Sequence, residues 1–166
     1  MTPSARPSTG TRLGVSGHQV LPVTALGPVV AGLHQAVAEA GAGVTGVTSL
    51  AAGADQLFAR EVLAAGGTLH VVVPCSGYEM TFEGANRATY HCLLDRAEAI
   101  DTLPFENPSE AAFYAAGRRV VDLCDRLLAV WDGRAARGLG GTADIVAYAH
   151  ERGRDIRVIW PAGVRR

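Results

Sequence analysis

The sequence contains no lysine: all fifteen basic residues are arginines. This absence excludes catalysis through a lysine Schiff base, and it excludes the lysine-bearing phosphate loop of Walker type. Cysteine is scarce as well, because Cys75, Cys92 and Cys124 are the only three and none forms a Cys-x-x-Cys pair. Their odd number and wide spacing indicate neither a disulfide framework nor a zinc site, and we expect reduced thiols in the core. We predict no metal site, and no cofactor is indicated.

The sequence also lacks an excess of either positive or negative charge. The net charge is −1 and the pI is about 6.5, so the chain lacks the concentrated positive field with which nucleic-acid coats and polybasic membrane surfaces bind. We therefore expect a small-molecule ligand, no nucleic acid and no membrane as partners. No apolar run is long enough to span a bilayer, and the first ten residues lack the apolar segment of a secretory signal. These features predict a soluble, cytoplasmic protein.

Length and apolar content suit one globular domain with a sizeable core, since 48% of the 166 residues are hydrophobic. We expect a flexible N-terminal tail over residues 1–10 and a single domain over 11–166. Apolar runs predict strands at 12–16, 45–50, 68–74, 99–103, from 126, and 155–160. Helical patterns lie between them, at about 23–40, 56–65, 86–97, 111–124 and from 142. This alternation predicts a Rossmann-like α/β fold, with a mainly parallel sheet of about six strands and helices on both faces.

A glycine-rich turn opens the last expected helix. Gly138, Gly140 and Gly141 lack the Cβ atoms that would keep a ligand away from the backbone, and Thr142 is expected as the N-cap. The first N–H groups of a helix are unpaired and carry the positive end of its dipole, so they bind phosphate without a cationic side chain. We predict a phosphate-binding loop here. A loop made flexible by glycine, with no ligand, is the alternative.

Polar residues follow the other expected strands, at the edge where open α/β sheets bind ligands. His18, after the first strand, is either a ligand-binding residue or an ordinary surface histidine. Ser49 offers a hydroxyl and Gly53 permits a tight turn after the second strand. Asp55 either accepts hydrogen bonds from ribose hydroxyls or only caps its helix. Tyr78, after the third strand, either stacks on a base or packs beneath a loop.

A further polar face recurs at four-residue spacing along the helix expected at 111–124. It consists of Tyr114, Arg118 and Asp122, with Gly117 allowing a close neighbour. This face is either solvated or the wall of a pocket. In a pocket, Arg118 would be the fork-shaped donor to a phosphate or carboxylate.

Taken together, several segments resemble the SLOG superfamily, which joins the DNA-processing Smf/DprA proteins with the LOG, or lysine decarboxylase-like, phosphoribohydrolases. These segments are GVSGH at 14–18, SLAAGAD at 49–55, YAAGRRVVD at 114–122, VWDG at 130–133 and GGTAD at 140–144. The resemblance implies a Rossmann-like domain that binds nucleotides or nucleotide-derived signals, with phosphate at the turn before the last helix. By the same analogy we expect a homodimer or a larger homo-oligomer.

The LOG enzymes hydrolyse the N-glycosidic bond of nucleoside 5′-monophosphates and carry the signature Pro-Gly-Gly-x-Gly-Thr-x-x-Glu. Aligned on Thr142, the proline position is Arg137, the second glycine is Leu139 and the glutamate is Ile145, while Asp144 stands one residue earlier. One residue turns a helical side chain by about 100°, so Asp144 need not point where the glutamate does. We therefore expect a nucleotide-binding sensor or carrier, with hydrolysis as the second hypothesis and an inert assembly subunit as the third.

The hydrolase hypothesis has its own candidate catalytic residues. Asp144 or Asp55 would hold the ribose and assist departure of the base, while Arg118 and the loop amides would hold the phosphate. The base and the number of phosphates stay open. The predicted ligand site comprises Ser16, Gly17, His18, Ser49, Gly53, Asp55, Tyr78, Tyr114, Arg118, Asp132, Gly133, Gly138, Gly140, Gly141 and Thr142.

Overall fold

Strands and helices alternate along the chain in the computed structural model, which describes residues 10–135 and 138–166. The tail predicted at 1–10 lies outside the described residues apart from Gly10, and so does Arg137. The strands are β1 (Arg12–Gly17), β2 (Thr45–Thr48), β3 (Thr68–Val73), β4 (Ala99–Thr102), β5 (Arg126–Val130) and β6 (Asp155–Val158). The helices are α1 (Val23–Ala40), α2 (Ala54–Ala64), α3 (Ala85–Leu94), α4 (Glu110–Leu123) and α5 (Thr142–Glu151), with a 3-10 helix η1 (Tyr78–Thr81) before α3.

Several element boundaries differ from the predictions by a few residues, among them the end of α3 and the start of α5. Helix α3 ends at Leu94 because the amides of Arg96 and Ala97 bond to carbonyl groups three residues earlier, which closes a tight turn. The N-cap of α5 is Gly141, so the prediction of Thr142 as the cap is wrong by one residue. Thr142 is the first helical residue instead.

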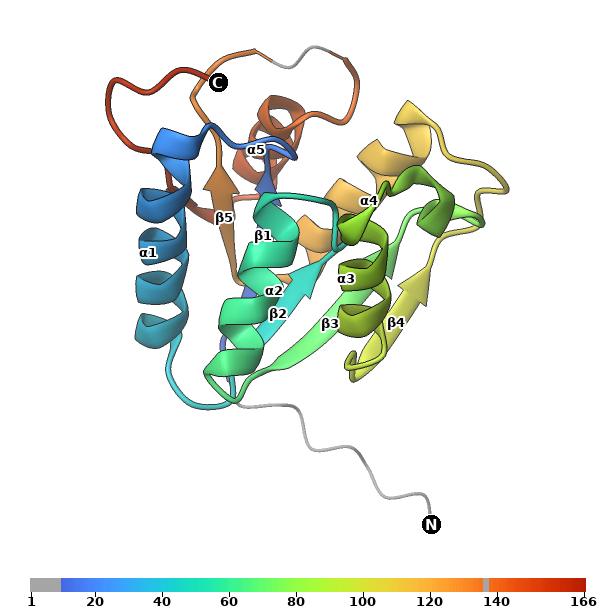
Figure 1. Ribbon diagram of the computed structural model, residues 1–166, viewed down its shortest axis with the longest axis horizontal. Helices are drawn as coiled ribbons and strands as arrows, with labels where there is room; N and C mark the ends of the chain where they lie inside the picture. The colour runs from blue at the N-terminus through green and yellow to red at the C-terminus, as the bar shows by residue number, and fades with distance from the viewer. Residues whose placement is uncertain (1–9, 136–137) are drawn as a thin grey trace.

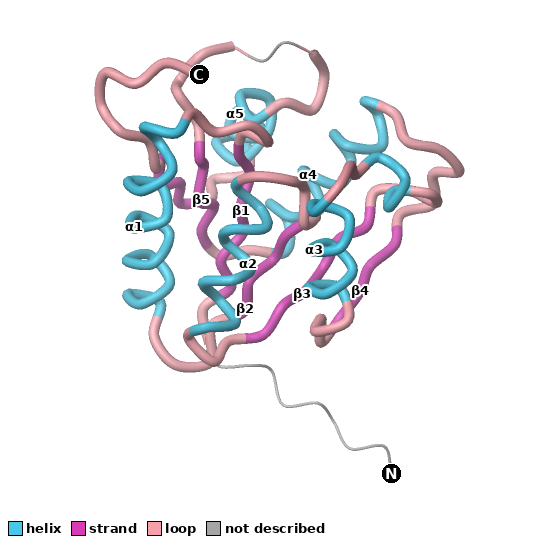
Figure 2. The backbone as a smooth tube through the Cα atoms, in the orientation of Figure 1, coloured by secondary structure: helices cyan, strands magenta, loops and turns pink. Residues whose placement is uncertain are grey.

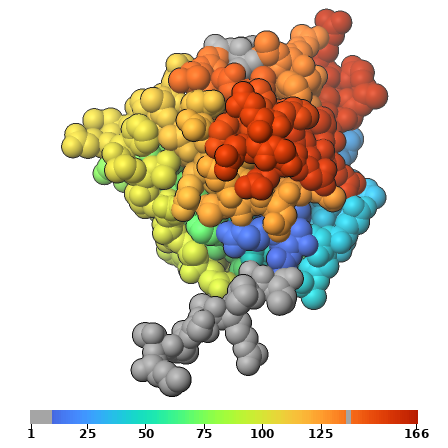
Figure 3. Space-filling model, turned by 180° about the vertical axis from the view of Figure 1, so that it is seen from behind, coloured from blue at the N-terminus to red at the C-terminus, as the bar shows by residue number. Residues whose placement is uncertain are grey.

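The six strands form one parallel sheet in the order β4-β3-β2-β1-β5-β6. Right-handed crossovers place α1, α2 and α3 on one face of this sheet (Figure 1). The chain then returns to β5, so that α4 and α5 cover the opposite face, as seen from behind in Figure 3. The predicted α/β class, with helices on both faces, is confirmed.

Side chains of the central strands alternate between two apolar layers. Val71 and Leu128 pack toward α1 and α2, whereas their neighbours Val72 and Leu127 pack toward α4 and α5. Successive strand residues point to opposite faces, so a strand buried on both sides reads as an unbroken apolar run. This is why β3 and β5 were easy to predict.

All three cysteines are free; Cys75 and Cys124 are buried, but Cys92 is exposed on α3 and is not the core thiol that we expected. Among residues 10–135 and 138–166, no helix is long and apolar enough to cross a membrane. Loops gather along the edge where β1 and β5 end (Figure 2).

Candidate functional site

A cavity of about 710 Å³ opens at the edge of the sheet where β1 and β5 end. These strands flank the point where the strand order reverses, because the chain runs outward from β1 to β4 and then returns to β5 on the other side of β1. In open parallel sheets, ligands bind in the crevice at this point. The cavity therefore lies where the topology itself favours a ligand.

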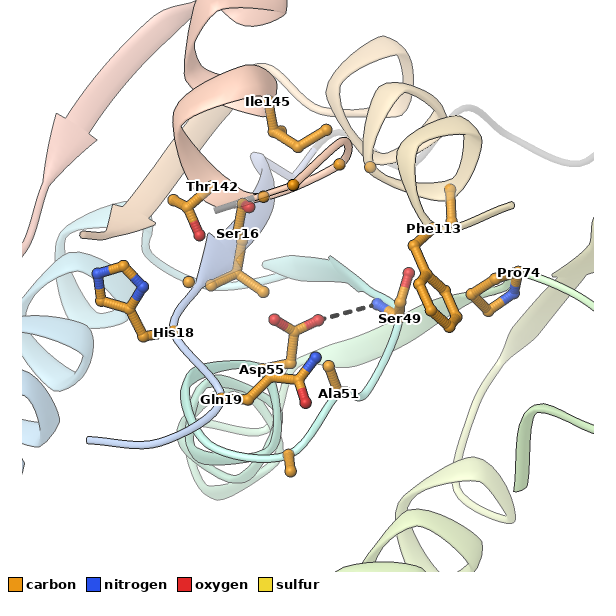
Figure 4. A pocket seen from close by; sticks show the side chains of 18 of the residues that line it. Ser16, His18, Gln19, Ser49, Ala51, Asp55, Pro74, Phe113, Thr142 and Ile145 are labelled. Carbon is orange, nitrogen blue, oxygen red and sulfur yellow. Dashed lines mark hydrogen bonds between the residues drawn. The ribbon is translucent and has the colours of Figure 1, made fainter. Parts of the chain in front are cut away.

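The structure brings many of the predicted site residues together around this cavity. Those that line it are Ser16, Gly17, His18, Ser49, Asp55, Tyr78, Gly138, Gly140, Gly141 and Thr142. In the view of Figure 4, His18 and Thr142 lie toward one end and Phe113 and Pro74 toward the other. Asp55 lies between the two ends.

The remaining predicted residues, all within the described part of the chain, do not line the cavity: Gly53, Tyr114, Arg118, Asp132, Gly133 and Asp144. Arg118 is exposed and lies over the ring of Tyr148, at 4.8 Å from its centroid. It lines a separate pocket of about 290 Å³ between α4 and residues 103–105. Gly53 has a structural role, because a Cβ there would lie 2.3 Å from the carbonyl oxygen of Gln19. The structure thus does not bring Arg118 to the glycine turn.

The glycine turn before α5 forms one wall of the cavity. Gly140 has φ +86°, and a Cβ there would lie 2.9 Å from the backbone nitrogen of Tyr114, so this position requires glycine. Gly141 has φ −68°, which any residue adopts, and it lines the cavity. The amides of Thr142 and Ala143 lie in the first turn of α5, where a helix provides no carbonyl for them.

Asp144 and Ile145 point in different directions. The carboxylate of Asp144 turns back and accepts a hydrogen bond of 3.0 Å from the N–H of Gly140, which braces the turn. Ile145 is buried, lines the cavity, and packs so close to α4 that a Cβ on Gly117 would lie 2.3 Å from its Cδ1. The wall is therefore apolar where the LOG signature has its glutamate.

Asp55 is a buried carboxyl group in the middle of the cavity. One of its oxygens accepts a hydrogen bond from the hydroxyl of Thr48 at 2.8 Å. The same oxygen accepts from the amide of Ser49 at 3.1 Å (Figure 4). Burial raises the pKa of Asp55 to about 6, and these hydrogen bonds oppose the rise without cancelling it. At neutral pH the Asp55 side chain is therefore largely a carboxylate that accepts hydrogen bonds. Below about pH 6 it is mostly protonated.

The backbone beside Asp55 is strained at Leu50. Leu50 has φ +57°, which among the described residues no other non-glycine residue shares. Its N–H donates to the Thr48 hydroxyl, and its carbonyl accepts from Gln56, whose amide also bonds the carbonyl of Asn86. A strained backbone held by such contacts is typical of ligand-binding turns. No sequence pattern predicts this turn, because leucine rarely adopts a positive φ.

A cluster of charged side chains lies at the end of the cavity near His18. The Nε2 of His18 lies 3.3 Å from an oxygen of Asp132, and its Nδ1 lies 3.2 Å from a guanidinium nitrogen of Arg166. A guanidinium only donates, so Nδ1 accepts from Arg166, and the backbone amide of Asp132 donates to Nε2 at 3.2 Å. Burial raises the pKa of Asp132, but the Arg134 amide, His18 and Arg166 outweigh burial and hold this pKa below its ordinary value. Within the described residues, no group of three or more His, Cys, Asp or Glu side chains is placed to hold a metal ion.

The apolar end of the cavity is aromatic. Tyr78 packs against Phe82 and Phe113 at centroid distances of 5.0 and 6.3 Å, and burial raises its pKa well above the ordinary value. Tyr78, the first residue of η1, therefore belongs to an aromatic cluster as well as lining the cavity. Phe113 was missed, although it shares a helical stripe at 113, 116, 117 and 120, all of which line the cavity. The sequence did not single out Gln19, Pro74, Phe82, Phe113, Arg134 or Arg166.

Comparison with solved structures finds this arrangement of strands and helices in other proteins. DprA from Streptococcus pneumoniae matches with a TM-score of 0.63 and 21% identity, over 90% of this chain and 50% of that one. DprA from Helicobacter pylori matches with a TM-score of 0.64 and 17% identity, over 90% and 65%. The molybdenum cofactor binding protein from Rippkaea orientalis matches with a TM-score of 0.58 and 18% identity, over 93% and 77%.

The chain shares its fold with the two DprA proteins and the molybdenum cofactor binding protein. The resemblance predicted from the sequence is thus confirmed as a likeness of fold, and the chain spans half the length of the first DprA and 65% of the second. Sequence comparison finds no matching family model and no matching curated protein.

The fold shared with DprA corrects one expectation drawn from composition. Net charge predicts no nucleic-acid partner, and this prediction is wrong, because DprA from Helicobacter pylori has this fold and a single-stranded DNA binding mode. Binding to phosphates depends on where arginines and amides gather on a surface, and a net charge near zero does not prevent such gathering. Nucleic acid therefore stays among the partners to be tested.

Proposed function

We propose that this chain binds a nucleotide or a nucleotide-derived small molecule in the cavity at the ends of β1 and β5, as a sensor or carrier. The observation that carries the proposal is the joint presence of a glycine turn at the start of α5 and a buried acceptor, Asp55, in one cavity. The amides of the turn suit a phosphate, and a carboxylate suits ribose hydroxyls. Single-stranded DNA and the molybdenum cofactor, named as ligands of proteins with this fold, also carry phosphate.

The order of the strands supports a nucleotide lying lengthwise. The glycine turn follows β5, Asp55 and Ser49 follow β2, and Pro74 follows β3. Strands β5, β1, β2 and β3 are neighbours, so the span from the first to the last is roughly 14 Å at the usual strand spacing. A nucleoside monophosphate in extended form has a comparable length. Its phosphate would lie at α5, its ribose at Asp55 and its base between Pro74 and Phe113.

Binding without hydrolysis is supported by the two residues at the start of α5. Ile145 occupies the cavity wall, and an apolar side chain neither transfers a proton nor stabilises a developing cation. Asp144 is engaged with the Gly140 amide and does not line the cavity. We therefore transfer the candidate acid of the hydrolase hypothesis to Asp55, whose raised pKa is the observation that favours an N-glycosidase as the second function.

The test is a binding panel followed by an assay for turnover. The four common nucleoside 5′-monophosphates, their nucleosides, cyclic nucleotides and a short single-stranded DNA are titrated into the full chain by calorimetry. We expect at least one monophosphate to bind more tightly than its nucleoside, with no free base or ribose 5-phosphate released. A ligand present at a hundred times its dissociation constant should add roughly 2.7 kcal/mol to the free energy of unfolding.

Each outcome of this panel decides between the functions. Release of base over many turnovers, abolished by Asp55→Asn, would establish the glycosidase. Binding of the DNA alone, with no mononucleotide, would assign the cavity to a strand of nucleic acid. If none of these compounds binds, the proposal fails.

A further inference from the structure

Arg166 lies at the crevice, far along the chain from every motif in the sequence. Its guanidinium contacts His18, the residue after β1, and Asp132, the second residue after β5. These are the two strands that flank the reversal of strand order. The side chain of Arg166 is 25% exposed and lines the same cavity as Gly141 and Thr142.

The segment that carries Arg166 is fixed by packing. The amide of Ile159 bonds to the carbonyl of Ala129 at 2.8 Å, which ties the chain after β6 to β5. The indole N–H of Trp160 donates to the carbonyl of Val164 at 2.8 Å, and its ring meets the His18 ring edge-on at 5.3 Å. The approach of this segment to the cavity is therefore built into the fold.

The guanidinium of Arg166 keeps donors for a ligand. Within the described part of the chain, its contacts involve only Nη1, toward His18, and Nε, which lies 3.8 Å from Oδ2 of Asp132. That oxygen is buried and makes no hydrogen bond to any described residue. Asp132 thus attracts Arg166 electrostatically without accepting a hydrogen bond from it. The planar guanidinium therefore keeps N–H groups that can donate to an anion.

We propose that Arg166 is the cation of a phosphate subsite, shared with the amides at the start of α5, and that Asp132 and His18 position it. This inference rests on the proposed function and names the residue that reads the ligand's phosphate. Arg134 also lines this end of the cavity, but no ion pair or hydrogen bond with a described residue holds its guanidinium, whereas His18 and Asp132 hold that of Arg166. Held by a buried carboxylate, Arg166 loses little freedom when a phosphate binds.

The experiment compares Arg166→Gln with Arg165→Gln, an equal loss of charge at the neighbouring exposed residue. Calorimetry measures the affinity of wild type and both variants for 5′-AMP, 5′-GMP, 5′-CMP and 5′-UMP, each beside its nucleoside. We expect Arg166→Gln to weaken monophosphate binding by at least about tenfold and to leave the nucleoside unchanged within about twofold. Arg165→Gln should change neither by more than about twofold.

Asp132→Asn tests the positioning role. It should weaken monophosphate binding in the same sense, and the double variant with Arg166→Gln should be no weaker than Arg166→Gln alone, because both changes remove one interaction. Equal effects of Arg166→Gln and Arg165→Gln, or an equal loss of nucleoside binding, would overturn the proposal. An unchanged circular dichroism melting curve confirms that each variant is folded.

Failure of the proposed function is distinguishable from failure of this inference. If no nucleotide or nucleoside binds the wild type, the same variants are titrated with inorganic pyrophosphate. Pyrophosphate binding that depends on Arg166 and not on Arg165 would support the phosphate subsite, while the proposed nucleotide-binding function would be rejected. No binding of pyrophosphate, or binding that ignores Arg166, would reject the subsite.

Discussion

Asp55 lowers the stability of the fold at neutral pH, and we propose that it contributes to ligand binding. Its carboxyl group is buried, and burial raises its pKa from 3.8 to about 6. The folded protein thus holds the proton over a pH range in which the unfolded chain has lost it. By linkage, the free energy of unfolding falls as the pH rises from about 4 to about 6, and the loss persists above that range.

Asp55→Asn should therefore stabilise the fold at neutral pH relative to its effect at pH 4. The amide oxygen of asparagine accepts the same hydrogen bonds from Thr48 and Ser49, and it has no charge to desolvate. The difference in free energy of unfolding between variant and wild type should rise by on the order of 2–3 kcal/mol between pH 4 and pH 7. Urea denaturation at each pH measures it.

The control for Asp55 is the exposed Asp95, whose replacement by asparagine should hardly change the free energy of unfolding. The same Asp55→Asn protein should bind the nucleotide more weakly, because it has lost the charged acceptor for ribose hydroxyls. A variant that is no more stable at pH 7 than at pH 4, relative to wild type, would contradict the burial argument. Gain of stability with loss of binding is typical of a residue kept for function.

At the scale of an element, the start of α5 separates two roles of glycine. Gly140→Ala should destabilise the fold by about 1–3 kcal/mol, because φ +86° strains alanine and its Cβ meets the backbone of Tyr114. Gly141→Val has an ordinary φ of −68° and should cost about 1 kcal/mol or less as an N-cap change. Thermal unfolding of both variants measures this difference.

Nucleotide titration of Gly141→Val completes the comparison. We expect its binding to be weakened far more than its folding, because a branched side chain occupies the space of the phosphate at the cavity wall. Unchanged affinity in the folded variant would place the phosphate elsewhere. The two neighbouring glycines thus report separately on the shape of the turn and on its ligand.

At the scale of the whole molecule, burial is concentrated in the centre of the sheet. Strands β2 and β5 are buried almost throughout, and β1 lies between them. Strands β4 and β6 are at the two edges and are mostly exposed or half-buried. Hydrogen exchange should therefore be slowest in β1, β2 and β5 and much faster in β4 and β6. Equal protection of β4 and β2 would show that the sheet opens only by global unfolding.

The same contrast explains how far the sequence alone predicts this protein. Periodicity identifies buried strands such as β3 because apolar side chains on both faces leave an unbroken run, and the parallel topology then places His18, Asp55 and Thr142 at one edge. The direction in which a side chain points is not predicted in this way. Asp144 turning back to Gly140 and Arg118 lying over Tyr148 depend on packing between helices, which a one-dimensional pattern does not contain.

Contacts between distant parts of the chain are the other limit. Arg166 reaches His18 across 148 residues of sequence. No spacing rule connects two such positions, because their meeting depends on the return of the chain after β6. The turn at Leu50 was missed for the opposite reason, since its strain is local but is held by Gln56 and the surrounding packing.

The place of β1 in the sheet has a consequence for how the chain folds as it is synthesised. Leu13 in β1 pairs with Arg126 in β5, so the partner of one long side of β1 is made only after more than a hundred intervening residues. Until then a nascent sheet of β1 to β4 has an apolar open edge, which favours pairing with another chain. The crevice that we assign to the ligand lies at the seam that this late pairing closes. Pairing of β5 with β1 therefore removes this open edge, and β6 then covers the other side of β5.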